Sequence, residues 1–273
     1  MNISMCLRSN QLPTPDSRLR EGFGDACRSA FGAGSWSVGV VVVLATLIST
    51  DVSAQGRQVS FRADDGHLVS ALLTEASQRR VFGAVVSAEA TPAVVLIGML
   101  GRPKDDWYST AALLAAANIT SLAIDLRAPQ LPEDGSGASW HVDVAAAVSF
   151  LVARPDVRPW AIGVAGASLG ANLAAIAASV DPRIRSLALI SPSLDYRGIR
   201  SEAPLKQYAE RPALLIASLR DPYSARSARE LAADAPGVRE IQWAESAAHG
   251  TILLAREPDV VRRLVEWFQR TLQ

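Results

Sequence analysis

Three residues that together can perform nucleophilic catalysis occur in the order serine, aspartate, histidine in the second half of the chain. Ser168 is the centre of Gly-Ala-Ser-Leu-Gly, Asp221 lies in "SLRDP" and His249 lies in "AHG". A serine hydroxyl becomes an effective nucleophile when a histidine takes its proton, and a carboxylate holds that histidine in the right tautomer. The sequence therefore predicts acyl-transfer chemistry with Ser168 as nucleophile, His249 as base and Asp221 as the carboxylate.

Other residues of the same types offer alternatives. His67 lies beside an N-terminal turn and His141 opens a predicted helix, so surface or capping roles suit both better than the role of base. Asp195, in "SPSLDY", follows a predicted strand as Asp221 does, and it is the alternative carboxylate. The small residues around Ser168 are also typical of a helix that packs on a sheet. The presence of Asp221 and His249 is what favours the interpretation of Ser168 as a catalytic serine.

Short apolar runs alternate with helical patterns from Gln55 onward. Strands are predicted within 58–74, on both sides of an Asp-Asp-Gly turn, and at 93–100, 120–126, 160–166, 186–193, 213–218 and 238–244. Helices are predicted at 106–117, 139–155, 168–180, 224–235 and 259–272. This alternation predicts one α/β domain over 55–273, with a mostly parallel twisted sheet, helices on both faces and an antiparallel N-terminal hairpin.

With these elements in place, the chain resembles the α/β-hydrolase superfamily over nearly all of 55–273. The resemblance rests on Gly-Ala-Ser-Leu-Gly at a strand-to-helix turn, followed in order by "SLRDP" and "AHG". "LIGMLGRPKDDW" resembles the superfamily's oxyanion-hole loop and "AIDLRAPQLPEDG" resembles the loop after the fourth strand. The resemblance implies a serine esterase type with little or no cap domain.

The oxyanion hole is expected to consist of backbone N–H groups. Leu169 lies at the start of a predicted helix, where free N–H groups favour an anion. The resemblance implies a second donor from Met99 or Leu100, although Gly98-Met99 stands where relatives often carry His-Gly. The fourth-strand loop also departs from the superfamily pattern, and we assign it no catalytic role.

The connection over 194–211 is short where many relatives carry a lid of several helices. We therefore expect a nearly uncapped site that suits short-chain or exposed esters, on a small molecule or on a polymer. Trp107, Tyr108 and Tyr196 are candidate walls of a substrate pocket, together with Met99, and ordinary packing is the alternative for each.

The expected function is cleavage of carboxylic esters by a serine hydrolase through an acyl-enzyme, without a cofactor. Peptidase-like or perhydrolase chemistry on the same fold is one alternative, and a non-catalytic binding protein with this fold is another. The sequence leaves open whether the substrate is an ester, a thioester or an amide, and it leaves open the oligomeric state.

Composition argues against several other function classes. Lys and Arg total 27, as do Asp and Glu, so no net charge attracts nucleic acid. Both cysteines, Cys6 and Cys27, precede Gln55, which excludes thiolate chemistry from the rest of the chain. The three histidines share no helix face, so no metal site is expected.

Residues 1–54 have a different sequence pattern from the rest of the chain. The apolar stretch Val38–Ile48 has the length of a signal-peptide core, and Val52-Ser53-Ala54 places small residues where a signal peptidase reads. We expect a presequence cleaved after Ala54, a periplasmic or secreted location, and no stable membrane span in the mature chain. A retained anchor helix or a buried strand is the alternative.

Overall fold

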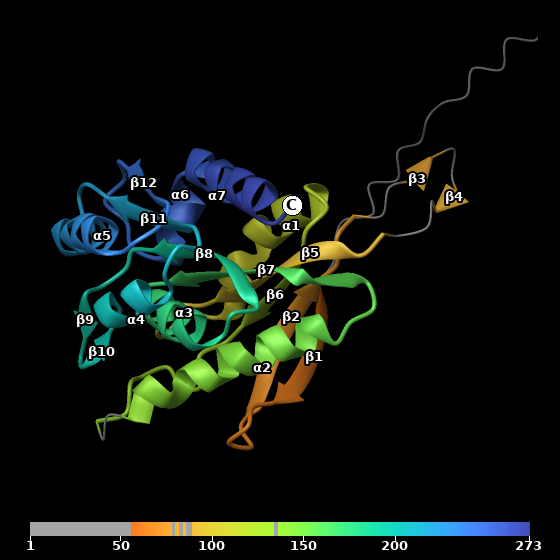
Figure 1. The fold of residues 1–273 in the computed structure, drawn as a ribbon, viewed down its shortest axis with the longest axis horizontal. Helices are drawn as coiled ribbons and strands as arrows, with labels where there is room; N and C mark the ends of the chain where they lie inside the picture. The colour runs from red at the N-terminus through yellow and green to blue at the C-terminus, as the bar shows by residue number, and fades with distance from the viewer. Residues whose placement is uncertain (1–55, 78–79, 82–83, 86–88, 134–135) are drawn as a thin grey trace, which may run out of the picture. The chain divides into compact units, whose positions relative to one another are not determined.

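The strands predicted from the apolar runs lie side by side in one eight-stranded sheet (Figure 1). The computed structural model describes residues 56–77, 80–81, 84–85, 89–133 and 136–273, which lie within one compact unit. The predicted presequence lies outside these residues. The sheet has the order β1-β2-β6-β5-β7-β8-β11-β12. Its strands are β1 (Arg57–Arg62), β2 (Leu68–Thr74), β5 (Thr91–Ile97), β6 (Thr120–Ile124), β7 (Val157–Ala167), β8 (Ile184–Ile190), β11 (Ala213–Ser218) and β12 (Arg239–Ala244).

The predicted N-terminal hairpin is confirmed at one edge of this sheet. β1 pairs antiparallel with β2, and β2 pairs antiparallel with β6, whereas the other neighbours are parallel. At the turn, the amide of Ala63 donates to His67 O and Gly66 adopts φ +86°, a conformation that favours glycine. Because parallel strands run the same way, the loops after them gather at one edge, where the predicted site residues lie.

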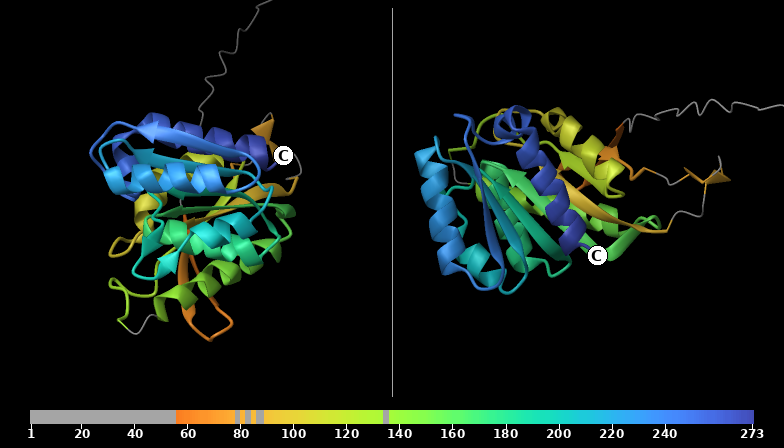
Figure 2. Two further views of the ribbon diagram at one scale, coloured as in Figure 1. Left: turned by 60° about the vertical axis from the view of Figure 1, so that its left-hand side comes forward. Right: turned by 90° about the horizontal axis from the view of Figure 1, so that it is seen from above.

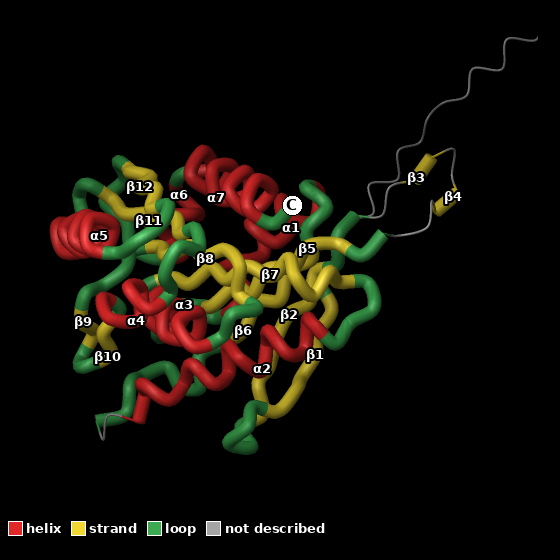
Figure 3. Tube along the Cα trace, viewed as in Figure 1, coloured by secondary structure: helices red, strands yellow, loops and turns green. Residues whose placement is uncertain are grey.

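Helices cover both faces of the sheet (Figures 1 and 2). One face packs against α2 (His141–Val152), α3 (Leu169–Val180), α4 (Glu202–Gln207) and α5 (Pro222–Asp234). The other face packs against α1 (Tyr108–Ala116), α6 (Thr251–Arg256) and α7 (Pro258–Thr271). The tube drawing shows the same strands between two sets of helices (Figure 3).

β5 is apolar at successive positions because helices cover both faces of the sheet at this strand. Ala93, Val95 and Ile97 point into the apolar cluster on the α2–α3 side, and Val94 and Leu96 point into the cluster on the α1–α7 side. All five side chains are fully buried. A strand covered on both faces needs apolar residues at every position and therefore lacks the polar alternation of a half-exposed strand.

Several short elements were not predicted from the sequence. They are β3 (Arg80–Val81), which pairs with β4 (Ala84–Val85), β9 (Asp195–Tyr196), which pairs with β10 (Ile199–Arg200), and the helices α4 and α6. The predicted helix at 106–117 begins with a 3₁₀ turn, η1 (Lys104–Trp107), and a second 3₁₀ turn, η2 (Ser136–Trp140), precedes α2. Elements of two to six residues are too short to show a hydrophobic period. Among the described residues, no helix is long and apolar enough to span a bilayer.

Candidate active site

Ser168 occupies the single residue between β7 and α3. Its backbone has φ 54° and ψ −120°, a conformation that is strained for a residue with a side chain. The amide of Ser168 donates to Ile190 O at 2.9 Å, which fixes the turn to the neighbouring strand β8. Such a sharp strand-to-helix turn lifts the serine hydroxyl above the edge of the sheet.

The two glycines of the motif are required by close backbone approach. A Cβ built on Gly166 would lie 2.1 Å from Gly170 O. A Cβ on Gly170 would lie 2.5 Å from Gly98 O and 2.9 Å from Ile97 O. Because any side chain at either position would collide with backbone atoms, the glycines allow the end of β5 to rest against the start of α3.

The structure brings Ser168, His249 and Asp221 into hydrogen-bond contact. His249 Nε2 lies 2.8 Å from Ser168 Oγ, and His249 Nδ1 lies 2.6 Å from Asp221 Oδ2. An ionised carboxylate only accepts hydrogen bonds, so the proton of a neutral imidazole lies on Nδ1 and leaves Nε2 to accept from the serine hydroxyl. This is the arrangement in which a histidine can take the serine proton.

Asp221 is also the N-cap of α5. Its Oδ1 accepts from the amide of Ser224 at 3.2 Å, and its Oδ2 accepts from Ser224 Oγ at 2.7 Å. Burial of the carboxylate opposes ionisation, but the hydrogen bonds from His249 and Ser224 outweigh burial and hold the pKa of Asp221 below its ordinary value. The buried Ser224 is a site residue that sequence reasoning missed, although its place three residues after Asp221 fits a helix cap.

The predicted oxyanion loop lies against the first turn of α3. Ile97 is the register partner of Gly166, so the residues after β5 run beside the Ser168 turn. Leu100 packs against the small apolar cluster that contains Leu169. The first N–H groups of a helix have no partner within the helix, so the amide of Leu169 is a free donor at this point. Met99 and Leu100 remain predicted as the source of the second donor.

A hydrogen-bond network joins the oxyanion loop to the histidine loop. Arg102 donates to both carboxylate oxygens of Asp106 at 2.8 Å, and Thr251 Oγ1 donates to Asp106 Oδ2 at 2.6 Å. Burial raises the pKa of Asp106, but the bonds from Arg102 and Thr251 outweigh burial, so the pKa lies below its ordinary value. Asp106 therefore connects two loops that sequence reasoning treated separately.

The alternative residues lie elsewhere and have other partners. Asp195 is in β9, where its carboxylate accepts from Arg200 Nε and from the amide of Gly198. His141 Nδ1 lies 2.8 Å from Ala138 O at the start of α2, and His67 lies in the turn of the N-terminal hairpin. The two histidines lie in the turn and at the helix start that the sequence indicated for them.

The candidate pocket walls divide into three cases. Trp107 has no exposed surface and packs in the core with Ala111 and Leu114, so it does not line an open pocket. The expectation for Trp107 gives way to ordinary packing, because its indole lies in the apolar cluster on the α1–α7 side of the sheet. Tyr108 is about half exposed, and Tyr196 packs on the apolar cluster that contains Leu169.

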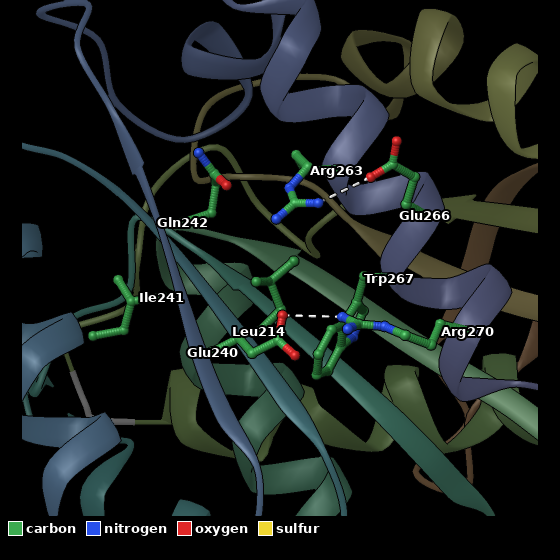
Figure 4. Close-up of a pocket in the computed structure, with 8 residues that line it drawn as sticks. All are labelled: Leu214, Glu240, Ile241, Gln242, Arg263, Glu266, Trp267 and Arg270. Atoms are coloured by element: carbon green, nitrogen blue, oxygen red, sulfur yellow. Dashed lines mark hydrogen bonds and ion pairs between the residues drawn. The ribbon is translucent and has the colours of Figure 1, made fainter.

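Two surface hollows lie near the starts of the strands, away from Ser168, Asp221 and His249. One, of about 230 Å³, lies between β11, β12 and α7, and its Arg263 and Arg270 pair with Glu266 and Glu240 (Figure 4). The other, of about 560 Å³, lies near the starts of β7 and β8. Both are near strand starts, whereas Ser168, Asp221 and His249 follow strand ends.

Ionic contacts fasten the loop after β6, which carries no predicted catalytic residue. Asp125 accepts from Lys104 Nζ at 2.6 Å, and Arg127 makes a two-pronged ion pair with Asp143 and a further contact with Asp65. The carboxylate partners raise the pKa of Arg127 further above its ordinary value, against the effect of burial. Across the described part of the chain, no group of three His, Cys, Asp or Glu side chains is placed to hold a metal ion.

Comparison with known proteins identifies the fold. No known family profile matches the chain. The chain is 35% identical over 118 residues to "Thiohydrolase apmlB" of Arthrinium phaeospermum, a match that spans 41% of this chain and only 38% of that protein. The chain therefore covers well under half of that relative's length.

Solved structures match over a larger part of the chain. DcsB in complex with its substrate analogue has a TM-score of 0.67 and 14% identity, over 80% of this chain and 99% of that one. Dienelactone hydrolase from Anabaena variabilis has a TM-score of 0.63 and 19% identity, over 81% and 100% of the chains. EstE1, a carboxylesterase cloned from a metagenomic library, has a TM-score of 0.62 and 18% identity, over 81% and 90%. These likenesses show the fold.

Proposed function

Because the chain has the α/β-hydrolase fold, we propose that it is a serine hydrolase that cleaves carboxylic esters through an acyl-enzyme. The observation that carries the proposal is the chain of contacts from Ser168 Oγ to His249 Nε2 and from His249 Nδ1 to Asp221 Oδ2, at 2.8 and 2.6 Å. The strained conformation of Ser168 supports the same role, because strain of this kind persists where function needs it.

The mechanism follows from these positions. Ser168 Oγ attacks the ester carbonyl while His249 Nε2 takes the hydroxyl proton, and Asp221 stabilises the resulting imidazolium. The amide of Leu169 and that of Met99 or Leu100 donate to the oxyanion. His249 then gives the proton to the departing alcohol, which leaves an acyl-serine. Water, activated by His249, releases the acid and restores Ser168.

The substrate class follows from what covers the site. The connection between β8 and β11 holds only the β9–β10 pair and the short helix α4, which falls short of a multi-helix lid. We propose esters that are short-chained or exposed on a larger molecule, because a lightly covered site offers little enclosed apolar surface for a long acyl chain.

A fluorophosphonate probe tests the proposal directly. The wild-type protein is expected to form a covalent adduct on Ser168, and Ser168→Ala is expected to take no label while keeping its unfolding temperature. Ser179→Ala, which removes a hydroxyl from the far end of α3, is the matched control and is expected to label fully. A wild-type protein that takes no label would contradict the proposal and favour a non-catalytic binding protein.

Thioester cleavage is a second candidate, favoured by the name of the thiohydrolase that matches part of the chain. The same serine, histidine and oxyanion donors would act on a thioester carbonyl. Matched oxygen and sulfur esters of one acyl group, compared by kcat/KM, separate the two candidates. p-Nitrophenyl esters of increasing chain length measure the preferred length of the acyl group. Turnover of aminoacyl arylamides would favour peptidase-like chemistry, and peroxide-dependent halogenation would favour perhydrolase chemistry.

We also propose that residues 1–54 direct export and are removed after Ala54. The length of the apolar stretch and the small residues before the cleavage point support this location. Expression of the full chain in a bacterium with two membranes, followed by fractionation and N-terminal sequencing, should yield a periplasmic protein that begins at Gln55. A cytoplasmic or uncleaved product would contradict it.

A further inference from the structure

The end of β8 contacts the turn of Ser168, the strand that leads to Asp221 and the loop of His249. Ile190 O, on the last residue of the strand, accepts the amide of Ser168 at 2.9 Å. The next residue, Ser191, donates its own amide to Ile216 O of β11 at 2.7 Å, and β11 leads to Asp221. The Ser191 hydroxyl accepts the amide of Gly250 at 2.9 Å, directly after His249.

Ser191 holds this place in an unfavourable backbone conformation. Its φ is 50°, a region that favours glycine, yet the residue keeps a side chain that is fully buried. A glycine would fit the backbone with less strain, but it would lose the hydroxyl. The hydroxyl is therefore the feature that the buried serine adds at this point.

The bond to Gly250 acts on the peptide that carries the histidine. The amide of Gly250, the carbonyl of His249 and His249 Cα belong to one planar peptide group, so holding that amide restrains the backbone from which the His249 side chain leaves. Gly250 itself has φ 59° and ψ −134°, and a Cβ built on it would lie 2.7 Å from Met99 Sδ. The amide is buried, and loss of its acceptor would leave it without a partner.

We propose that Ser191 is a positioning residue that holds His249 at hydrogen-bond distance from Ser168. This inference rests on the proposed function. It means that the distance between His249 Nε2 and Ser168 Oγ depends on a hydroxyl group outside the three predicted residues. Ile190 holds the Ser168 turn and Ser191 holds the His249 loop, and both residues lie at the end of β8. The two reacting side chains are therefore held in place by the same strand end.

Two variants of Ser191 separate positioning from stability. Ser191→Gly removes the hydroxyl and relieves the backbone strain, whereas Ser191→Ala removes the hydroxyl and keeps the strain. We expect both to lower kcat by about ten- to hundredfold, since small displacements of a reacting group have effects of this size, with KM nearly unchanged. Ser191→Gly should unfold at a temperature no more than slightly below that of the wild type, and above that of Ser191→Ala.

Ser186→Ala is the matched control. Ser186 is a fully buried serine in the same strand, and its Oγ lies 2.7 Å from Thr271 Oγ1 at the opposite end of the sheet. The control should lower the unfolding temperature and leave kcat unchanged. If kcat instead follows the unfolding temperature across the three variants, Ser191 is merely structural and the inference is wrong.

Nuclear magnetic resonance of protein labelled with ¹⁵N-histidine supplies a readout that needs no turnover. The His249 Nδ1 proton, assigned by its absence in Asp221→Asn, should be sharp in the wild type and in Ser186→Ala, and broadened or lost in Ser191→Gly. An unchanged signal in Ser191→Gly would overturn the inference. A wild-type protein that takes no fluorophosphonate label would overturn the proposed function, while this signal would still decide the role of Ser191.

Discussion

Asp221 serves two purposes at the scale of a single residue. One carboxylate oxygen accepts from the amide of Ser224 in the first turn of α5. The other faces His249 Nδ1 at 2.6 Å and also accepts from Ser224 Oγ. Capping of α5 and orientation of the His249 ring therefore depend on the same side chain. Its depressed pKa keeps it ionised, which the hydrogen bond to His249 requires.

Substitution of the two candidate aspartates by asparagine distinguishes them. Asp221→Asn should lower kcat by about 10³–10⁴-fold, because an amide no longer enforces the histidine tautomer. Its stability should change little, because asparagine caps helices about as well as aspartate. Asp195→Asn should retain kcat within about twofold, since Asp195 is bonded to Arg200 and Gly198 in β9. Steady-state kinetics and thermal unfolding measure both, and a larger loss in Asp195→Asn would reverse the assignment.

At the scale of elements, the site depends on how η1 is joined to α6. The carboxylate of Asp106 is the shared acceptor of Arg102, in the oxyanion loop, and of Thr251, at the start of α6. His249 lies just before α6, so the contact fixes the histidine loop against the oxyanion loop. Neither α6 nor this contact has a local sequence signal.

The Asp106 contact predicts a pH-dependent contribution to stability. The pKa of Asp106 is lower in the folded protein, so its contribution is present above the unfolded pKa of about 4 and is lost as pH falls through the folded pKa. Asp106→Asn should lower the free energy of unfolding at pH 7 by about 1–2 kcal/mol, and the difference should shrink below about pH 4.

Urea unfolding at several pH values measures this difference. Asp105→Asn, at the exposed neighbouring aspartate, is the control and should change the free energy of unfolding little at any pH. A deficit in Asp106→Asn that persists unchanged at low pH would contradict the role given to the Asp106 carboxylate.

At the scale of the whole molecule, the described residues form apolar clusters on both faces of one sheet. α7 supplies much of the cluster on one face, and the strands and α2 and α3 supply the cluster on the other. No cysteine follows Gln55, so burial of apolar side chains has to stabilise this part of the chain.

A chain that begins at Gln55 should therefore fold without residues 1–54. We expect this shortened protein to unfold cooperatively, to take the fluorophosphonate label and to give the same kcat/KM as the processed full chain. Calorimetry and labelling of the two preparations, in the presence and absence of a reducing agent, measure this. A shortened chain that fails to unfold cooperatively would contradict the predicted domain boundary.

The sequence by itself determined the order of the main elements and the three residues of the predicted triad. Long apolar runs with helical patterns between them carry a strong local signal, and each triad residue follows a strand. The parallel sheet then brings these strand ends to one edge. Proximity of Ser168, Asp221 and His249 follows from that topology with little other information.

Only the tertiary structure decided how these residues are held. Ser191 accepts from Gly250, 59 residues away, and Asp106 accepts from Thr251, 145 residues away. Ser224 donates to Asp221, three residues away, and only the folded chain brings Asp221 to His249. A lone serine or aspartate has no periodic pattern, so its partner is unknown until the chain is folded. The same reason explains Trp107, whose aromatic ring suits a pocket wall or a core equally well until its packing is seen.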